Sequence, residues 1–236
     1  MASSHACLSR SRLALLLTCG AAMLAAQDAP QKPQRPKDAA ALFRQFAAVR
    51  GMSASYSEEK HLSLLAAPLT SSGKLYYMTD ADGKHGRLVR AVEKPEPSKL
   101  LVTERELRIA DRRGTEVIDL RQSDRVRMFV TSLMRVFQGD RAALTRSYHV
   151  RYAHHDQNKT GWRLDLTPKQ APLDKLLKQL SLHGDADAVT QIVLTEPSGD
   201  RTVTKITKLN PRRRFSQKFQ QGVFGVQPAK PKTTAK

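Results

Sequence analysis

Short segments in which apolar and polar residues alternate are the feature of this chain that most limits its fold. One run of them fills residues 53–120, and a second run fills residues 148–209. Turn sequences such as Asp-Gly, Lys-Pro-Glu-Pro and Arg-Arg-Gly separate the segments. A period of two, interrupted by closely spaced turns, is typical of antiparallel strands that follow one another in a sheet. The sequence predicts about five or six strands in the first run and about five in the second.

A helical pattern precedes the first run of strands. Asp38 can cap this helix and Gly51 can end it. A further helical turn is predicted over residues 172–180, because a proline is favourable at the first helical position. The apolar residues of the first helix recur at helical spacing: Leu42, Phe43, Phe46 and Val49.

A longer helical pattern, residues 123–140, separates the two runs of strands. Ser123 can cap it, Gly139 can end it, and Asp140 can begin another short helical turn. Its broad apolar face is either ordinary core or a lid over a ligand. The flanking arginines are either a solvated face or contacts for anionic headgroups. The apolar face consists of Val126, Phe129, Val130, Leu133, Met134, Val136 and Phe137.

The order of these elements predicts an α+β fold. A long antiparallel sheet twists and curls, and helices inserted halfway along the chain can then cover its concave face. We therefore expect one curved antiparallel sheet with helices over its concave side and a pocket between the two layers. No internal repeat is evident.

The first 26 residues have the pattern of a secretory signal. Arg10 and Arg12 precede a mainly apolar run that ends in small residues at Ala26. The run is too short for a membrane span. Cleavage after Ala26 fits best, and a lipoprotein-type cut before Cys19 is the alternative. Cleavage after Ala26 would remove both cysteines, Cys7 and Cys19, so the mature chain would have no disulfide and no cysteine metal site.

Composition divides the remainder into one domain and two tails. Residues 27–37 and 226–236 are proline-containing and polar, so we expect a disordered linker and a disordered basic tail. Residues 38–225 have the length of a single domain. The formal net charge of +18 includes two leader arginines, so the mature chain keeps an excess of 16 positive charges. Such an excess attracts anions, and a secreted address argues against nucleic acid, which leaves anionic lipid headgroups or acidic polysaccharide.

Residue patterns typical of enzymes are weak in this sequence. His154 and His155 are adjacent on a predicted strand, so they point to opposite faces and do not easily share a metal ion. The Asp80–Gly83 turn lacks the closing glutamate of a calcium loop. Paired acidic residues such as Glu58 and Glu59 are more simply surface charge. There is no nucleophile elbow, glycine-rich phosphate loop or His-Glu zinc motif. We expect no catalysis, no metal and no cofactor.

The residues also resemble a known family. The sequence of residues 43–77, then GRLVRAVEKPEPSKLLVTERELRI, FQGDRAALTRSYHVRY, TGWRLDLTPK and EPSGDRTVTKI, is similar in order to the periplasmic outer-membrane lipoprotein carriers, the LolA-like proteins. More narrowly, it is similar to a divergent branch whose second strand is preceded by a Leu-Ala-Pro-Leu stretch and a Ser-Gly. The resemblance implies an unclosed barrel of about 10–11 antiparallel strands with a helical lid. It also implies a monomer in the periplasm whose apolar cavity takes acyl chains from an inner-membrane donor to an outer-membrane acceptor, without catalysis.

The sequence departs from the better-known carriers in the third strand. There, Lys84 stands where those carriers have an arginine that helps hold the lid, and Arg90 stands in the place of a tryptophan. Lysine has no planar fork for bidentate pairing, so the lid contact is in doubt. Lys84, Arg87 and Arg90 are therefore candidates for lid or headgroup contacts. The change leaves open a partner of an envelope lipid or pigment pathway that handles a free lipid, and an anion-binding envelope module that is not a carrier.

The apolar stretch before the second strand has two interpretations. Leu64, Leu65 and Leu69 either fill a seam between the first helix and the sheet, or line the mouth of an acyl-chain cavity. Alternation places Leu75 with Tyr77, and Leu88 with Val92, on shared strand faces. The predicted cavity and lid residues are Leu64, Leu65, Leu69, Leu75, Tyr77, Leu88, Val92, Phe129, Val130, Leu133, Phe137, Trp162, Leu164 and Leu166.

Overall fold

The structure of the chain is a computed structural model that describes residues 34–80, 82–83, 85–154 and 159–225. The expected signal sequence, residues 27–33 of the expected linker and the C-terminal tail lie outside these residues. Lys84 and His155 lie outside them too.

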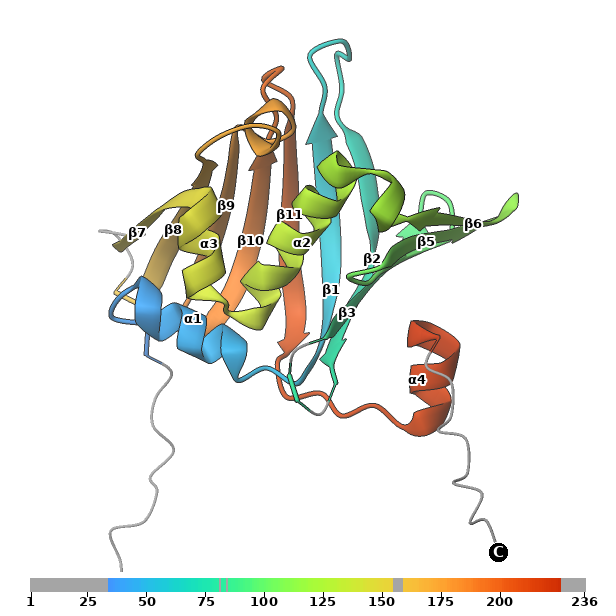
Figure 1. The fold of residues 1–236 in the computed structure, drawn as a ribbon, viewed down its shortest axis with the longest axis horizontal. Helices are drawn as coiled ribbons and strands as arrows, with labels where there is room; N and C mark the ends of the chain where they lie inside the picture. The colour runs from blue at the N-terminus through green and yellow to red at the C-terminus, as the bar shows by residue number, and fades with distance from the viewer. Residues whose placement is uncertain (1–33, 81, 84, 155–158, 226–236) are drawn as a thin grey trace, which may run out of the picture. The chain divides into compact units, whose positions relative to one another are not determined.

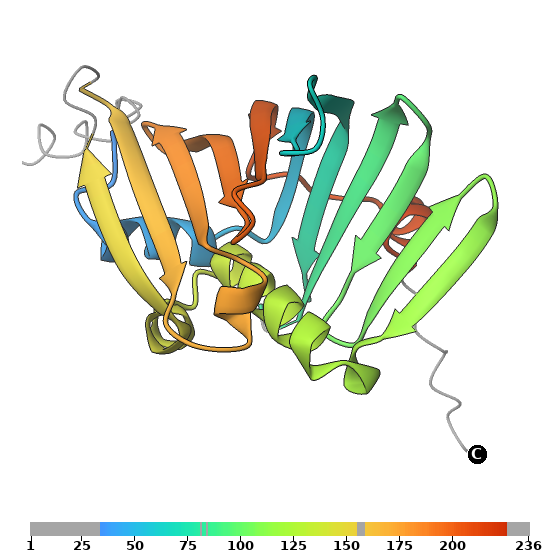
Figure 2. The same cartoon turned by 90° about the horizontal axis from the view of Figure 1, so that it is seen from above.

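The fold is built on one antiparallel sheet of eleven strands, in the order β6-β5-β4-β3-β2-β1-β11-β10-β9-β8-β7. The first and last strands of this order are edges, so the barrel is not closed, and the fold predicted from the sequence is confirmed. Figure 2 shows the curvature of the sheet. The strands are β1 (Gly51–His61), β2 (Leu69–Thr79), β3 (Gly86–Lys94), β4 (Ser98–Val102), β5 (Glu106–Asp111), β6 (Gly114–Asp119), β7 (Tyr148–His154), β8 (Gly161–Pro168), β9 (Gln179–Asp185), β10 (Ala188–Thr195) and β11 (Arg201–Asn210).

Two long-range contacts join the first strand of the sequence, β1, to the last strand, β11, and to the segment that follows it. Strand β1 pairs with β11 along most of its length, with Tyr56 opposite Ile206. Gly51 forms a bridge to Arg212, and a Cβ atom at Gly51 would lie 2.2 Å from the Arg213 carbonyl oxygen. The first helix therefore ends earlier than the sequence predicted, because Gly51 is already the start of β1.

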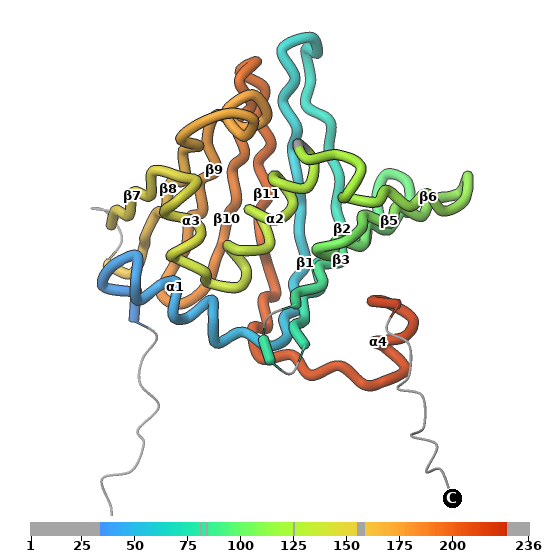
Figure 3. Tube along the Cα trace, in the orientation of Figure 1, coloured from blue at the N-terminus to red at the C-terminus, as the bar shows by residue number. Residues whose placement is uncertain are grey.

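The described residues form four α-helices, and three of these lie on the inner side of the sheet (Figures 1 and 3). Side-chain caps start these three: Asp38 accepts from the Ala41 amide, Ser123 from the Val126 amide, and Asp140 from the Ala143 amide. Gly139 ends the central helix in the left-handed conformation, with φ of 66°. The three helices are α1 (Ala39–Ala47), α2 (Asp124–Gln138) and α3 (Arg141–Ser147).

The helix α4 (Gln217–Phe224) packs on the opposite face of the sheet and was not predicted from the sequence. Its Phe224 contacts Val89 and Leu101, whose side chains point away from the face that carries Leu88 and Val102. The short 3-10 turns are η1 (Leu120–Gln122) and η2 (Leu173–Lys175). The helical turn expected over residues 172–180 is therefore limited to η2, because Gln179 already pairs in β9.

The buried residues of the inner face form two clusters. In the larger one, Leu42 and Phe43 of α1 pack with Leu144 of α3 on the β8 and β9 side chains. In the other, Val130 and Met134 of α2 pack on Tyr77 and Leu88. Helix α2 thus spans both clusters and holds the two halves of the sheet together. Among the described residues, no helix is long and apolar enough to cross a membrane.

Candidate functional site

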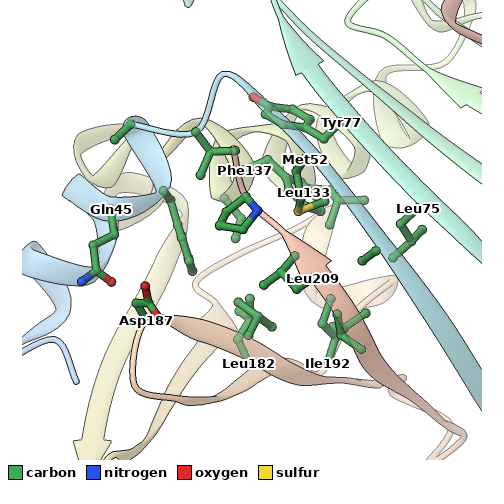
Figure 4. A pocket seen from close by; sticks show the side chains of 18 of the residues that line it. Gln45, Met52, Leu75, Tyr77, Leu133, Phe137, Leu182, Asp187, Ile192 and Leu209 are labelled. Carbon is green, nitrogen blue, oxygen red and sulfur yellow. The ribbon is translucent and has the colours of Figure 1, made fainter. Parts of the chain in front are cut away.

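A cavity of about 330 Å³ lies between the helices and the inner face of the sheet (Figure 4). Its walls come from α1 and the segment after it, from α2, and from five strands that are far apart in the sequence. Apolar side chains form most of the lining. They are Phe46, Ala48, Val49, Met52, Ala54, Leu75, Tyr77, Leu133, Val136, Phe137, Leu180, Leu182, Val189, Ile192, Ile206, Leu209 and Pro211.

The periodicity of each element explains why these side chains face the cavity. Met52 and Ala54 are two residues apart on β1, and so are Leu180 and Leu182 on β9, so each pair shares one face of its strand. On α2, Leu133, Val136 and Phe137 have the spacing of one helical face. The cavity is thus a space that the converging faces of sheet and lid leave unfilled.

A polar rim marks one side of the cavity. Gln45 comes from α1, Asp187 from the turn between β9 and β10, and Arg212 from the segment after β11. All three are solvent-exposed, in contrast to the lining behind them. A ligand with a polar end and an apolar chain would keep the polar end at this rim and the chain inside.

Tyr77 is the phenol in the cavity wall. It is fully buried, and no described residue gives its hydroxyl a hydrogen-bond partner. Burial raises the pKa of Tyr77 to about 12, so the phenol stays neutral. A Cβ atom at the neighbouring Gly86 would lie 2.5 Å from the Met134 Cε atom, so the Met134 side chain would have to shift.

A charged cluster follows the apolar cavity along β1 and β2. Arg90 forms an ion pair of 2.6 Å with Glu58, and its guanidinium lies 4.9 Å from the centroid of the Tyr56 ring. Ser71 accepts a further hydrogen bond from Arg90 at 3.0 Å, and Thr204 donates to Glu58 at 2.9 Å. Burial raises the pKa of Tyr56. The inner face of β1 thus changes from apolar at Ala54 to charged at Glu58, four residues further along the strand.

A family model described as "outer membrane lipoprotein carrier protein LolA-like" matches residues 31–208. The chain belongs to this family. The resemblance seen in the sequence is therefore confirmed, and the match covers the cavity walls from α1 to Ile206 in β11. The comparison with curated proteins found no match.

Several solved structures are similar to this LolA-like chain at low sequence identity. MucB has 15% identity and a TM-score of 0.47 over 77% of this chain and 61% of its own. A putative outer membrane lipoprotein-sorting protein domain from Vibrio parahaemolyticus has 9% identity and a TM-score of 0.43 over 79% and 99%. A LolA superfamily protein from Nitrosomonas europaea has 13% identity and a TM-score of 0.38 over 76% and 96%. The matched part of this chain thus spans about three fifths of MucB.

The structure places the predicted site residues in three groups. Leu75, Tyr77, Leu133 and Phe137 line the cavity. A second group lies in the packed clusters beside it: Leu88, Phe129, Val130, Trp162, Leu164 and Leu166. Val92 is half-buried and does not line the cavity. The second group packs beside the cavity and is not part of its lining.

The prediction for Leu64, Leu65 and Leu69 is wrong in both of its forms. These leucines are exposed at the end of the β1–β2 hairpin, and none of them lines the cavity or belongs to a buried cluster. The physical reason is the length of the two strands: β1 continues to His61, so the leucines are carried away from α1 and the lid.

The three basic residues predicted to contact the lid or headgroups do not lie together. Arg87 lies on the outer face, where its guanidinium donates to the Phe224 carbonyl oxygen at 3.5 Å, so it contacts α4 and not the lid. Arg90 lies on the inner face and pairs with Glu58. Lys84 is outside the described residues.

The sequence predicted four of the twenty lining residues, and the whole wall from β9, β10 and β11 was missed. Leu180, Leu182, Ile192, Ile206 and Leu209 come from β9, β10 and β11. Alternation in LSLHG and TQIVLT does show which of these side chains share a strand face. It does not show that β11 pairs with β1, which is what brings them opposite Leu75.

The described residues offer no alternative site for metal chemistry. No group of three or more His, Cys, Asp or Glu side chains among them is placed to hold a metal ion. The apolar lining of the cavity suits non-covalent binding of an apolar group.

Proposed function

We propose that this protein is a periplasmic carrier that binds an acyl chain in the cavity and transfers it towards the outer membrane without catalysis. The observation that carries the proposal is the cavity itself, a space of about 330 Å³ with an almost wholly apolar lining between lid and sheet. Apolar cavities of this kind stay dry until an apolar guest enters. Membership of the lipoprotein carrier family supports the same use.

The volume indicates how much cargo the resting cavity holds. It lies at the lower end of the range of about 300–1,000 Å³ for small-molecule sites. If a methylene group takes about the volume of a water molecule, roughly 30 Å³, three chains of sixteen carbons would need over about 1,000 Å³. We therefore propose that the resting form takes one chain or part of one, and that a triacylated cargo requires α1 or α2 to move.

Transfer of methylene groups from water provides enough free energy for a carrier. Each buried methylene contributes about 0.8 kcal/mol, so ten of them give about 8 kcal/mol before the cost of ordering the chain. This is strong enough for transport through water, and it leaves no covalent bond to be broken at the acceptor.

A free lipid or a lipid-like pathway product is the second candidate cargo. The small cavity and the charged cluster at Glu58 and Arg90 favour it over a triacylated protein, because one chain fills the space and polar groups lie next to it. The organic extract of protein purified from its own periplasm, analysed by mass spectrometry, separates the two cargoes. A free lipid supports the second candidate, and a co-purified acylated protein supports the first.

Binding is tested by displacement of a fluorescent fatty-acid analogue. The full-length mature protein is expected to bind the probe saturably, and unlabelled lipid is expected to displace it. Leu133→Asp places a charge in the lining and should abolish binding, whereas Met128→Asp on the exposed side of the same helix should not. Leu133→Trp is a second variant that fills the space without charge. Saturable binding that survives both changes at Leu133, or no saturable binding by the native protein, would overturn the carrier proposal.

A further inference from the structure

Exposed apolar side chains are concentrated in one loop of the described structure. Five large hydrophobic residues are exposed in the described part of the chain, and three of them join β1 to β2 or begin β2: Leu64 (94% exposed), Leu65 (46%) and Leu69 (53%). The residues between them, Ala66, Ala67 and Pro68, are exposed as well. We call residues 62–69 the leucine loop. Contiguous exposed apolar surface of this kind marks an interaction site.

The leucine loop is also free of charge. Residues 62–73 contain no Asp, Glu, Lys or Arg, although these types make up 26% of the chain. Basic residues come directly before and after this stretch, at Lys60, His61 and Lys74. An uncharged apolar segment between basic residues is the composition that suits a membrane interface, where long basic side chains reach the headgroups.

The structure holds the base of the leucine loop in place. The Ser63 amide donates to the Asp200 carboxylate at 2.8 Å, and the Leu65 amide donates to the Leu62 carbonyl oxygen at 3.0 Å. Asp200 belongs to the neighbouring turn between β10 and β11. In Figure 1 the β1–β2 hairpin reaches furthest at the top of the sheet, so no other described element covers its end.

From this exposure, composition and position we propose that the leucine loop inserts into the interface of a lipid bilayer. A loop of this size offers far less than the roughly 800 Å² per partner that a stable protein interface buries, so a second copy of the chain or a rigid partner is a poor match. A bilayer accepts leucine side chains without a complementary shape. Insertion stays shallow, because the loop backbone has polar groups that need water or headgroups as partners.

The cavity and the leucine loop lie at different positions along β1. Ala54 lines the cavity and Lys60 stands next to the loop, six residues or about 20 Å along β1. A docked loop would thus hold the cavity about 20 Å from the membrane surface. Membrane contact and cargo binding depend on different side chains, so each is measured without the other.

The flanking charges indicate that apolar insertion, and not charge, dominates this contact. Lys60 pairs with Glu196 at 3.6 Å, and His61 lies 3.5 Å from Glu59, so local positive charge is partly neutralised. We therefore expect binding to phosphatidylcholine vesicles that persists at high salt. Added phosphatidylglycerol should strengthen binding through the net charge of the whole chain, and salt should remove only that increase.

Vesicle flotation tests the proposal with a matched control. The mature protein without cargo should float with phosphatidylcholine vesicles, and Leu64→Ser with Leu65→Ser should lower the partition coefficient about tenfold or more. Val117→Ser changes a residue of similar exposure, 52%, on the edge strand β6 and should have no effect. An unchanged partition coefficient in the loop variant, or an equal loss in the Val117 variant, would overturn the proposal.

A fluorescence measurement distinguishes the bilayer from other occupants. The native tryptophan, Trp162, is fully buried and donates to the Ala186 carbonyl oxygen, so it should not respond to vesicles. The emission of Leu64→Trp should shift to the blue when vesicles are added. A shift that instead follows protein concentration without vesicles would mean self-association and would overturn the proposal. The cavity variant Leu133→Asp should still float, and this result keeps a failure of the carrier function distinct from a failure of membrane contact.

Discussion

Tyr77 of β2 stacks on Phe137 of α2, with ring centroids 5.3 Å apart and an angle of 25° between the rings. Both side chains line the cavity, so this contact joins its wall to its lid. A stacked aromatic pair contributes about 0.5–1.5 kcal/mol beyond the area that it buries. Movement of α2 away from the sheet has to break this contact first.

Phe137→Ala removes the stack and enlarges the cavity. The free energy of unfolding should fall by about 2–4 kcal/mol. This is less than for a core phenylalanine, because the Phe137 side chain is only partly buried. Urea unfolding measures this loss. The optimum length in a series of fatty acids should shift towards longer chains, because the ring no longer limits the space. A longer optimum in Phe129→Ala, whose side chain lies outside the lining, would contradict this reason.

Tyr77→Phe should protect the fold at alkaline pH. Burial raises the pKa of Tyr77 from its ordinary value of 10 to about 12. The stabilisation linked to the neutral phenol is therefore complete below pH 10 and is lost as the pH rises from 10 through 12. The loss amounts to about 2–3 kcal/mol, and the phenylalanine variant cannot suffer it.

The same variant should lose little at neutral pH, because the buried hydroxyl has no described hydrogen-bond partner. Urea unfolding of both proteins at pH 7 and pH 11 provides the measurement. Equal losses of stability at pH 11 would show that other groups, and not Tyr77, control alkaline unfolding.

The ion pair of Glu58 and Arg90 should show measurable coupling. Its side chains are only 20% and 31% exposed, so a double-mutant cycle with Glu58→Gln and Arg90→Met should give about 1–2 kcal/mol. The pair of Arg112 and Glu96 is a matched control, with exposures of 70% and 71%, and its cycle should give less than about 0.5 kcal/mol. Similar coupling in both cycles would mean that burial does not strengthen the inner pair.

Two glycine substitutions should change stability in opposite directions. A Cβ atom at Gly184 would lie 2.0 Å from the Trp162 ring and 2.6 Å from the Ala188 carbonyl oxygen, so Gly184→Ala should cost at least about 1–3 kcal/mol. Gly222 of α4 has no atom within 4 Å of such a Cβ, so Gly222→Ala should stabilise by about 0.5–1 kcal/mol. Thermal unfolding with Trp162 emission as the signal measures both. A neutral Gly184→Ala would show that β9 shifts freely.

Local periodicity was enough to predict the strands and the central helix. Trp162, Leu164 and Leu166 alternate with polar residues, and all three are fully buried as expected. Leu133 and Phe137 were placed on the lid face by helical spacing alone. These predictions hold because each depends on one element, whose period fixes the direction of its side chains.

Relations between distant elements were not predictable in this way. Nothing within residues 201–210 shows that β11 pairs with β1 and so adds Ile206 to the cavity. The leucine loop was misplaced because its apolar composition is equally consistent with burial and exposure. Helix α4 was missed even though Ser216, Phe219 and Gly225 give it a cap, an apolar position and a stop.

Helix α4 gives the two halves of the sheet unequal mechanical support. Behind the cavity wall, Tyr76 packs on Phe215, just before α4, and on Phe219 within it, so α4 supports β2 and β3 from the outer face. The outer faces of β8 and β9 carry instead the hydrogen-bonded polar pair Asp165 and Ser181. A guest wider than the resting space should therefore displace β8 and β9 more than β2 and β3, because α4 supports β2 and β3.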